Sequence, residues 1–73
     1  MRELLGRLVD QMIDGGITFE DGRREFERRF ISRVLDDTDG HLSKAALQLG
    51  LHRNTLTRKL AELEITPKKS KRR

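Results

Sequence analysis

Apolar residues near the start of the chain recur at intervals of three to four positions. They are Leu4, Leu5, Leu8, Val9, Met12 and Ile13. That spacing places them along one stripe of a helix, with polar residues on the remaining surface. The pattern predicts an amphipathic helix over residues 2–14, which Gly15 and Gly16 end.

A second amphipathic pattern follows, and it carries all three phenylalanines of the chain. Its apolar positions are Phe26, Phe30, Ile31, Val34 and Leu35. Thr18 is a favourable residue for the position before a helix, and Asp21 lies three residues later, as in a capping box. We therefore predict a second helix from about Phe19 to about Asp37, followed by a turn at Asp39-Gly40.

Two shorter helical patterns meet at Gly50. The first opens at Ser43, whose hydroxyl is expected to cap the helix, and continues through residues 44–49. Ala45 and Ala46 are short enough for a neighbouring helix to cross closely. Gly50 then ends this helix, because glycine adopts the left-handed conformation without a Cβ penalty.

The pattern after Gly50 separates a packing side from a polar side. Leu51 is expected to fill the angle between the two helices, and the packing side is expected to hold Leu56, Leu60, Ala61 and Leu63. The polar residues are Arg53, Asn54, Thr55, Thr57, Arg58 and Lys59. Residues 40–65 thus predict a helix-turn-helix. An ordinary helical hairpin is the alternative, but the charge up to Lys59 is nearly all positive.

The predicted fold is all-α, with four helices in a single domain over residues 1–66. A chain of 73 residues buries too little apolar surface to be comfortably stable alone. We expect residues 1–38 to form the intertwined core of a homodimer. The expected core residues are Leu5, Leu8, Val9, Met12, Phe26, Phe30 and Val34. The alternative is that both apolar stripes pack on the helix-turn-helix of their own chain.

Composition argues against several classes of function. There is no cysteine, and the two histidines lie eleven residues apart without a ligand cluster, so we expect no metal and no cofactor. No paired carboxylates, activated nucleophile or phosphate-binding glycine loop is present, so we expect neither an enzyme nor a small-molecule substrate. No apolar run reaches membrane-spanning length, and no signal-like segment is present, so a cytoplasmic location is expected.

Charge is distributed unequally along the chain. Residues 1–40 hold seven Lys/Arg against ten Asp/Glu, whereas residues 41–73 hold nine against two. The second half therefore favours a polyanionic partner. Pro67 ends the ordered region, and residues 67–73 are expected to form a basic flexible tail that adds salt-sensitive, non-specific affinity.

The stretch GHLSKAALQLGLHRNTLTRKLAELEI resembles the C-terminal helix-turn-helix of the Fis family (factor for inversion stimulation), which NtrC-type enhancer-binding activators share. The family's Ser/Thr-Lys/Arg-Ala-Ala start, Leu-Gly break and Arg-x-Thr-Leu-x-Arg/Lys-Lys-Leu reading helix correspond to residues 43–46, 49–50 and 53–60. More weakly, the two preceding amphipathic helices also resemble Fis. The resemblance implies a homodimer, nucleoid-associated or regulatory, that binds and bends duplex DNA.

Four differences from the expected pattern qualify that expectation. His41 replaces the asparagine usual after the turn glycine, which alters one local backbone contact. Thr57 replaces a second basic base-reading side chain, so the DNA sequence preference is expected to differ or to be weaker. The chain begins almost at its first helix, so we do not expect recombinase stimulation. Because it starts at Met1 and holds no ATPase domain, we do not expect a whole enhancer-binding activator.

Within this motif, the start of the second helix is expected to enter the DNA major groove. Arg53 is the foremost base-reading candidate, because its planar guanidinium can contact guanine O6 and N7. Asn54, Thr55 and Thr57 lie close enough to assist. The expected phosphate-binding residues are Ser43, Lys44, His52, Arg58 and Lys59.

The sequence thus predicts a homodimeric, sequence-tolerant regulator of double-stranded DNA in the bacterial nucleoid. The alternative function is a protein-docking module, in which the first two helices bind another protein and the basic half is incidental. Segregation of positive charge onto the reading helix and the tail argues against docking, since a docking domain has no need of it.

Overall fold

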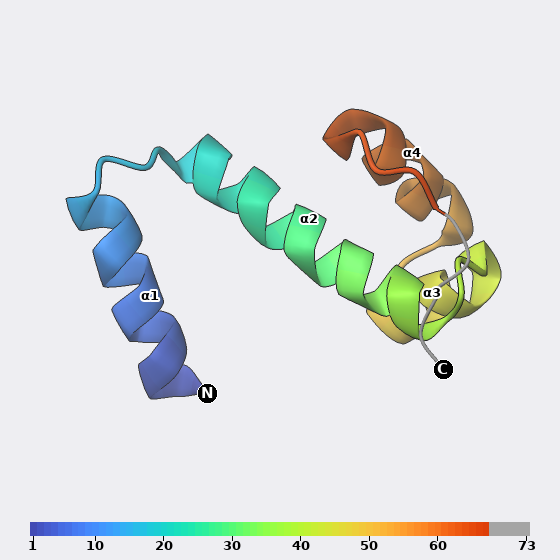
Figure 1. Cartoon of the computed structure of the whole chain (residues 1–73), viewed down its shortest axis with the longest axis horizontal. Coiled ribbons are helices and arrows are strands. Elements are labelled where there is room, and N and C mark those ends of the chain that lie inside the picture. Colours follow the sequence, from blue (N-terminus) through green and yellow to red (C-terminus); the bar gives the residue numbers. More distant parts are fainter. Residues whose placement is uncertain (68–73) are drawn as a thin grey trace.

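The computed structural model describes residues 1–67, and four α-helices and no strand lie in that range. The helices are α1 (Arg2–Asp14), α2 (Phe19–Asp37), α3 (Leu42–Leu49) and α4 (Arg53–Leu63). Figure 1 shows α3 and α4 gathered at one end of α2, with α1 at the other end. The predicted all-α fold with a C-terminal helix-turn-helix is confirmed, and the bounds predicted for the first two helices match those observed. Of the predicted tail, only Pro67 lies within the described residues.

The starts of α2 and α3 differ in how they are capped. The Thr18 hydroxyl accepts a hydrogen bond of 3.1 Å from the Asp21 N–H, as predicted for α2. By contrast, α3 begins at Leu42 after His41, which has an extended backbone and makes no side-chain cap bond. The carbonyl of His41 already accepts the first helical bond, from the Ala45 N–H. The prediction that Ser43 caps this helix is therefore wrong, because Ser43 lies inside the first turn.

All four helices end in the same hydrogen-bond pattern. Each helix is followed within two residues by a residue of positive φ, namely Gly16, Asp39, Gly50 and Glu64, and Gly40 after Asp39 also has a positive φ. The N–H of the following residue then reaches back to a carbonyl five positions earlier, for example from Leu51 to Ala46 at 2.9 Å. This Schellman motif reverses the chain abruptly. The prediction for Gly50 is confirmed, with φ of 73°.

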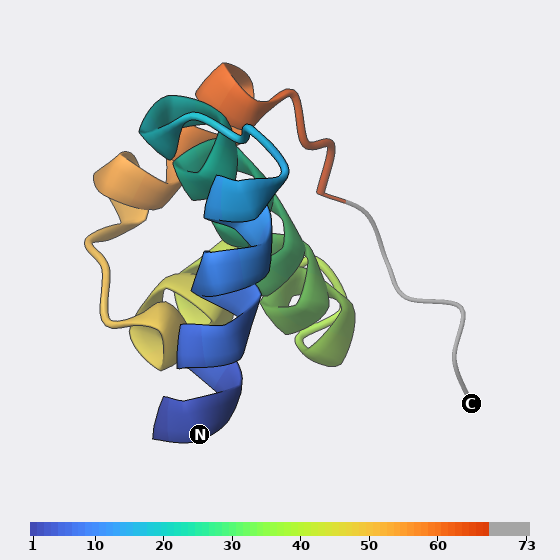
Figure 2. The ribbon, with the colours of Figure 1, turned by 90° about the vertical axis from the view of Figure 1, so that its left-hand side faces the viewer.

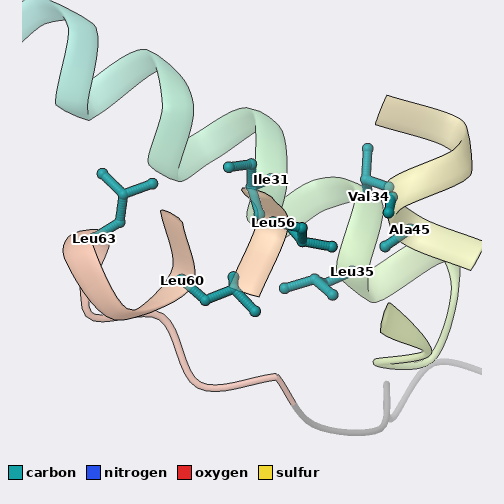
Figure 3. Packing of buried hydrophobic residues seen from close by; sticks show 8 residues of the cluster. Ile31, Val34, Leu35, Ala45, Leu56, Leu60 and Leu63 are labelled. Carbon is teal, nitrogen blue, oxygen red and sulfur yellow. The ribbon is translucent and has the colours of Figure 1, made fainter. Parts of the chain in front are cut away.

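The hydrophobic core lies where the second half of α2 meets α3 and α4. Its buried residues are Ile31, Val34, Leu35, Ala45, Ala46, Leu56, Leu60 and Leu63. Leu56 is fully buried between these helices (Figure 3), and full burial of a leucine contributes about 1.5–3 kcal/mol. Leu51 is half-buried at the angle between α3 and α4, whereas Ala61 is exposed. The predicted place of Ala61 on the packing side is thus wrong.

α1 has no buried residue. It diverges from α2 beyond the connection at residues 15–18, and Figure 2 gives the view from the α1 side. α1 approaches α2 at Gly22, where an added Cβ would lie 3.0 Å from Met12 Cε. The alternative in which the first stripe packs on its own helix-turn-helix is therefore wrong for α1.

Candidate nucleic-acid interface

The exposed face of α4 is set by the spacing of its residues. Leu56, Leu60 and Leu63 face the core, and the opposite side of the helix therefore presents Asn54, Thr57, Arg58 and Ala61, all of which are exposed. Ala61, near the C-terminal end of α4, adds only a methyl group to this face. A polar helix face that carries an arginine is suited to lie against a groove of a duplex.

His52 supplies the cap at the start of α4. Its Nδ1 accepts a hydrogen bond of 3.1 Å from the Asn54 N–H, so a neutral ring carries its proton on Nε2 and can donate it outward. The sequence predicted a phosphate contact for His52 and not this cap. Histidine is not among the common N-cap residues, so capping statistics alone do not identify this role.

Arg53 and Thr57 are both exposed on the first turns of α4. The Thr57 hydroxyl donates to the Arg53 carbonyl at 3.1 Å. Its oxygen therefore keeps lone pairs to accept a bond from a ligand, but its proton is already used. The Arg53 guanidinium has no hydrogen-bond or ion-pair partner among residues 1–67.

Thr55 and Lys59 lie one turn apart on the side of α4 that turns toward α2, and both are partly covered. The Lys59 ammonium is 3.2 Å from Glu27 Oε1 of α2, and the Lys59 side chain is 26% exposed. Two residues expected to contact DNA are therefore turned away from the exposed face of α4.

Cations on the helix-turn-helix differ in their pairing from most of those on α2. Carboxylates of the same helix bind three of the five α2 arginines, namely Arg23, Arg29 and Arg33. In contrast, Lys44, Arg53 and Arg58 are exposed, and within the part of the chain that the structure describes they form no ion pair. Unpaired cations on one surface favour binding of an anion.

Ser43 and Lys44 occupy the first turn of α3, where both are exposed. Three N–H groups at this helix start have no acceptor within the helix, and the helix dipole adds partial positive charge there. The structure thus brings Ser43 and Lys44 together at a helix start, as predicted, although Ser43 does not cap it.

The Glu27 carboxylate joins α2 to α4. Burial by itself would raise the pKa of Glu27, but hydrogen bonds from Lys59 and Arg23 outweigh it and hold that pKa below its usual value. Hydrogen bonds to Glu20 and Glu27 likewise raise the pKa of Arg23 above its ordinary value. Both groups therefore stay charged at neutral pH. Sequence reasoning missed Glu27, because its partner is 32 positions away along the chain.

In a comparison with protein families, residues 22–63 match the family described as bacterial regulatory protein, Fis family. That range starts near the beginning of α2 and ends with the last residue of α4. The chain belongs to the Fis family. α1 precedes the range that matches the Fis family, so the family model covers the packed core and the exposed face of α4 but not the first apolar stripe.

Curated relatives of this Fis-family chain include DNA-binding transcriptional regulators named NtrC. The protein of Klebsiella pneumoniae is 42% identical over 62 residues, which is 82% of this chain and 13% of that protein. The protein of Azospirillum brasilense is 52% identical over 42 residues, which is 58% of this chain and 9% of that protein. The chain thus spans about an eighth or less of these relatives. No solved structure matches it significantly.

The structure also bears on metal binding and on membrane spanning. Among residues 1–67, no three His, Cys, Asp or Glu side chains are placed to hold a metal ion. None of the helices in the described part combines the length and the hydropathy that a membrane span requires.

Proposed function

We propose that this Fis-family chain is a homodimeric DNA-binding regulator that inserts the α4 helices of two copies into the major groove. The observation that carries the proposal is the set of exposed, unpaired cations on α3 and α4, whereas three of the five α2 arginines are bound to carboxylates. The relatives named as DNA-binding transcriptional regulators support the same partner. In this proposal the chain binds DNA and catalyses no reaction.

Recognition of bases falls to the start of α4. Arg53 contacts a guanine edge, and Asn54 and Thr57 assist from the same exposed side. Arg58 and Lys44 bind phosphate oxygens, which fix the position of α4 without carrying sequence information. The Nε2–H of His52 is placed at the helix start to donate to a further phosphate.

Dimerisation falls to α1 and residues 19–30 of α2. A groove of about 1230 Å³ between them is lined by apolar residues of both helices, among them Leu5, Leu8, Val9, Met12 and Phe26. Phe26 and Phe30 remain 57% and 51% exposed, and their rings pack against each other with centroids 5.3 Å apart. A second copy covers this surface. Val34 differs, because it is already buried in its own chain.

Two recognition helices fixed in one dimer reach two half-sites on one face of the duplex, and bending the DNA improves contact at both. The proposed setting is the bacterial cytoplasm, where the protein acts as a transcription regulator or a nucleoid-associated protein. Flexible pyrimidine-purine steps between the half-sites are favoured without direct contact.

The test is binding to a randomised duplex pool across a salt titration, with the bound duplexes sequenced. We expect enrichment of a two-fold degenerate motif and steep loss of affinity with salt. Absence of binding even at low salt would contradict the proposal and favour a protein-docking role.

Arg53→Ala should cost about 1–3 kcal/mol on the enriched motif and relax sequence preference at one position of each half-site. Arg58→Ala is the matched control, since it removes the same type of cation one turn away. It should weaken binding to all sequences about equally. If both variants weakened every duplex by the same factor, base reading by Arg53 would be wrong.

A further inference from the structure

α4 is fastened to α2 by two polar contacts between residues far apart in the sequence. The Lys59 ammonium lies 3.2 Å from Glu27 Oε1. Near the end of the helix, the Arg24 guanidinium donates to the Glu62 carbonyl at 3.3 Å, where a carbonyl group has no partner within the helix. Both contacts act on the second half of α4, away from Arg53.

Both oxygens of Glu27 are engaged. Oε1 accepts from Lys59, and Oε2 accepts from Arg23 at 3.1 Å. Arg23 in turn binds Glu20, one turn earlier on α2. The side chains of Glu27, Lys59 and Arg23 are only 20%, 26% and 28% exposed. A charge removed this far from water depends on its partners more than a surface charge does.

Lys59 and Arg58 are adjacent in the sequence but differ in their surroundings. Arg58 is exposed and has no ion-pair partner among residues 1–67. Lys59 is a quarter exposed and is bound to Glu27. A phosphate would compete with Glu27 for the Lys59 ammonium, and if Lys59 moved away, the partly covered Glu27 charge would be balanced by Arg23 alone.

We propose that Glu27 is a positioning residue for DNA binding, which holds α4 against α2 through Lys59, and that Lys59 therefore makes no phosphate contact. This inference rests on the proposed function and revises the role expected of Lys59 from the sequence. Through the rigid helix, the Glu27–Lys59 pair fixes the angle at which Arg53 and Arg58 are presented to the duplex. The acidic half of the chain thereby takes part in recognition of an anion.

The experiment measures affinity and its salt dependence on a random-sequence duplex for the full chain and four variants. Lys59→Gln and Glu27→Gln each break the pair. Arg58→Gln removes an exposed cation of α4, and Asp36→Asn removes an acidic charge from an exposed position of α2. Circular dichroism and thermal melting establish that each variant is folded.

We expect Lys59→Gln to weaken binding by about fivefold, as loss of a partly covered ion pair would, with a salt slope parallel to that of the unaltered chain. Glu27→Gln should weaken binding by a similar factor, although it removes a negative charge. Asp36→Asn should leave binding unchanged or slightly stronger. Arg58→Gln should reduce the slope by about 0.9 for each phosphate that the arginine neutralises.

Two results would overturn the inference. A reduced slope for Lys59→Gln, equal to that of Arg58→Gln, would make Lys59 a phosphate ligand. Stronger binding by Glu27→Gln than by Asp36→Asn would mean that Glu27 withholds Lys59 from DNA. If Glu27→Gln failed to fold, the slope of Lys59→Gln would still decide. Failure of the unaltered chain to bind any duplex would instead contradict the proposed function itself.

Discussion

The two ends of α2 carry similar apolar residues in different surroundings. At its C-terminal end, Ile31, Val34 and Leu35 are buried against α3 and α4. Toward its N-terminal end, Phe19 and Phe26 remain more than half exposed, as do Phe30 in the middle of α2 and Leu4 and Ile13 of α1. One half of the chain thus forms its own core, whereas the other half presents an apolar surface that it does not cover.

The cations of the two halves also differ, in whether they are paired with carboxylates. On α2, three of the five arginines are bound to carboxylates of the same helix, as in Arg29–Glu25 and Arg33–Asp37. In the second half, Arg53 and Arg58 have no such partner among the described residues. Each half therefore leaves one kind of surface unsatisfied, which is apolar in the first half and cationic in the second. An apolar surface suits another copy of the protein, and a cationic surface suits a polyanion.

The largest expected effect is on the half of the chain that forms its own core, where α3 and α4 pack on the C-terminal part of α2. Leu56→Ala should destabilise the chain by about 2–5 kcal/mol, because Leu56 is fully buried and the change leaves a cavity. Chemical denaturation measures the free energy of unfolding. Leu47→Ala is the matched control, since Leu47 of α3 is 82% exposed and its loss should change stability little. Equal effects of the two variants would contradict the described core.

A smaller effect is expected on dimerisation, which involves the exposed apolar surface and not the core. Phe30→Ala should weaken dimerisation by about 2 kcal/mol per interface, as removal of a central aromatic residue does, with little change in the unfolding of dilute protein. Sedimentation at several concentrations measures the dissociation constant. Lower stability that does not depend on concentration would instead place Phe30 in the core of its own chain.

A third substitution, at the end of α4, should raise the folding stability of the half that forms its own core. Glu64 has φ of 58°, a conformation that glycine adopts without strain. Glu64→Gly should therefore stabilise the chain by about 0.5–1 kcal/mol in thermal or chemical unfolding. Ala61→Gly, inside α4, should destabilise it by about 1 kcal/mol. Destabilisation by both variants would argue against the left-handed end of α4.

The smallest expected effect concerns acid. The pKa of Glu27 is lower in the folded chain than its ordinary value of 4.5. The stabilisation from its ion pairs is thus present above about pH 4.5 and is lost as the pH falls through the lowered pKa. The difference in melting temperature between the unaltered chain and Glu27→Gln should shrink over that acidic range. A difference that stays constant in acid would mean that Glu27 does not titrate within the pair.

Short sequence patterns explain why the ends of three helices were predictable. The bounds of α1 and α2 follow from apolar spacing together with Thr18 and the paired glycines, and the break at Gly50 follows from its backbone freedom. The start of α3 was misplaced because the turn through Gly40 brings His41, rather than Ser43, to the cap position. The turn at Asp39-Gly40 was predicted, whereas Glu64 closes α4 without a glycine, so the sequence gave no signal for that left-handed end.

The candidate site was predictable in its location but not in its contacts. The sequence identified α4 and its polar residues, yet the orientation of each one depends on where α2 lies. Lys59 reads as one more cation of the basic stretch until Glu27, far away in the sequence, is placed beside it. Ala61 was assigned to the core from its apolar character, although its spacing from Asn54 and Arg58 puts it on the exposed face.

The central claim is that the apolar surface suits a second copy and the cationic surface suits DNA. Its most direct test is the mass of the complex formed with a duplex enriched from the random pool. Native mass spectrometry with the protein in slight excess gives the number of chains, each of 8.5 kDa, on one duplex. We predict two chains per duplex, since the uncovered apolar surface binds a second copy while both α4 helices contact DNA. A complex holding one chain, or no complex, would contradict the account.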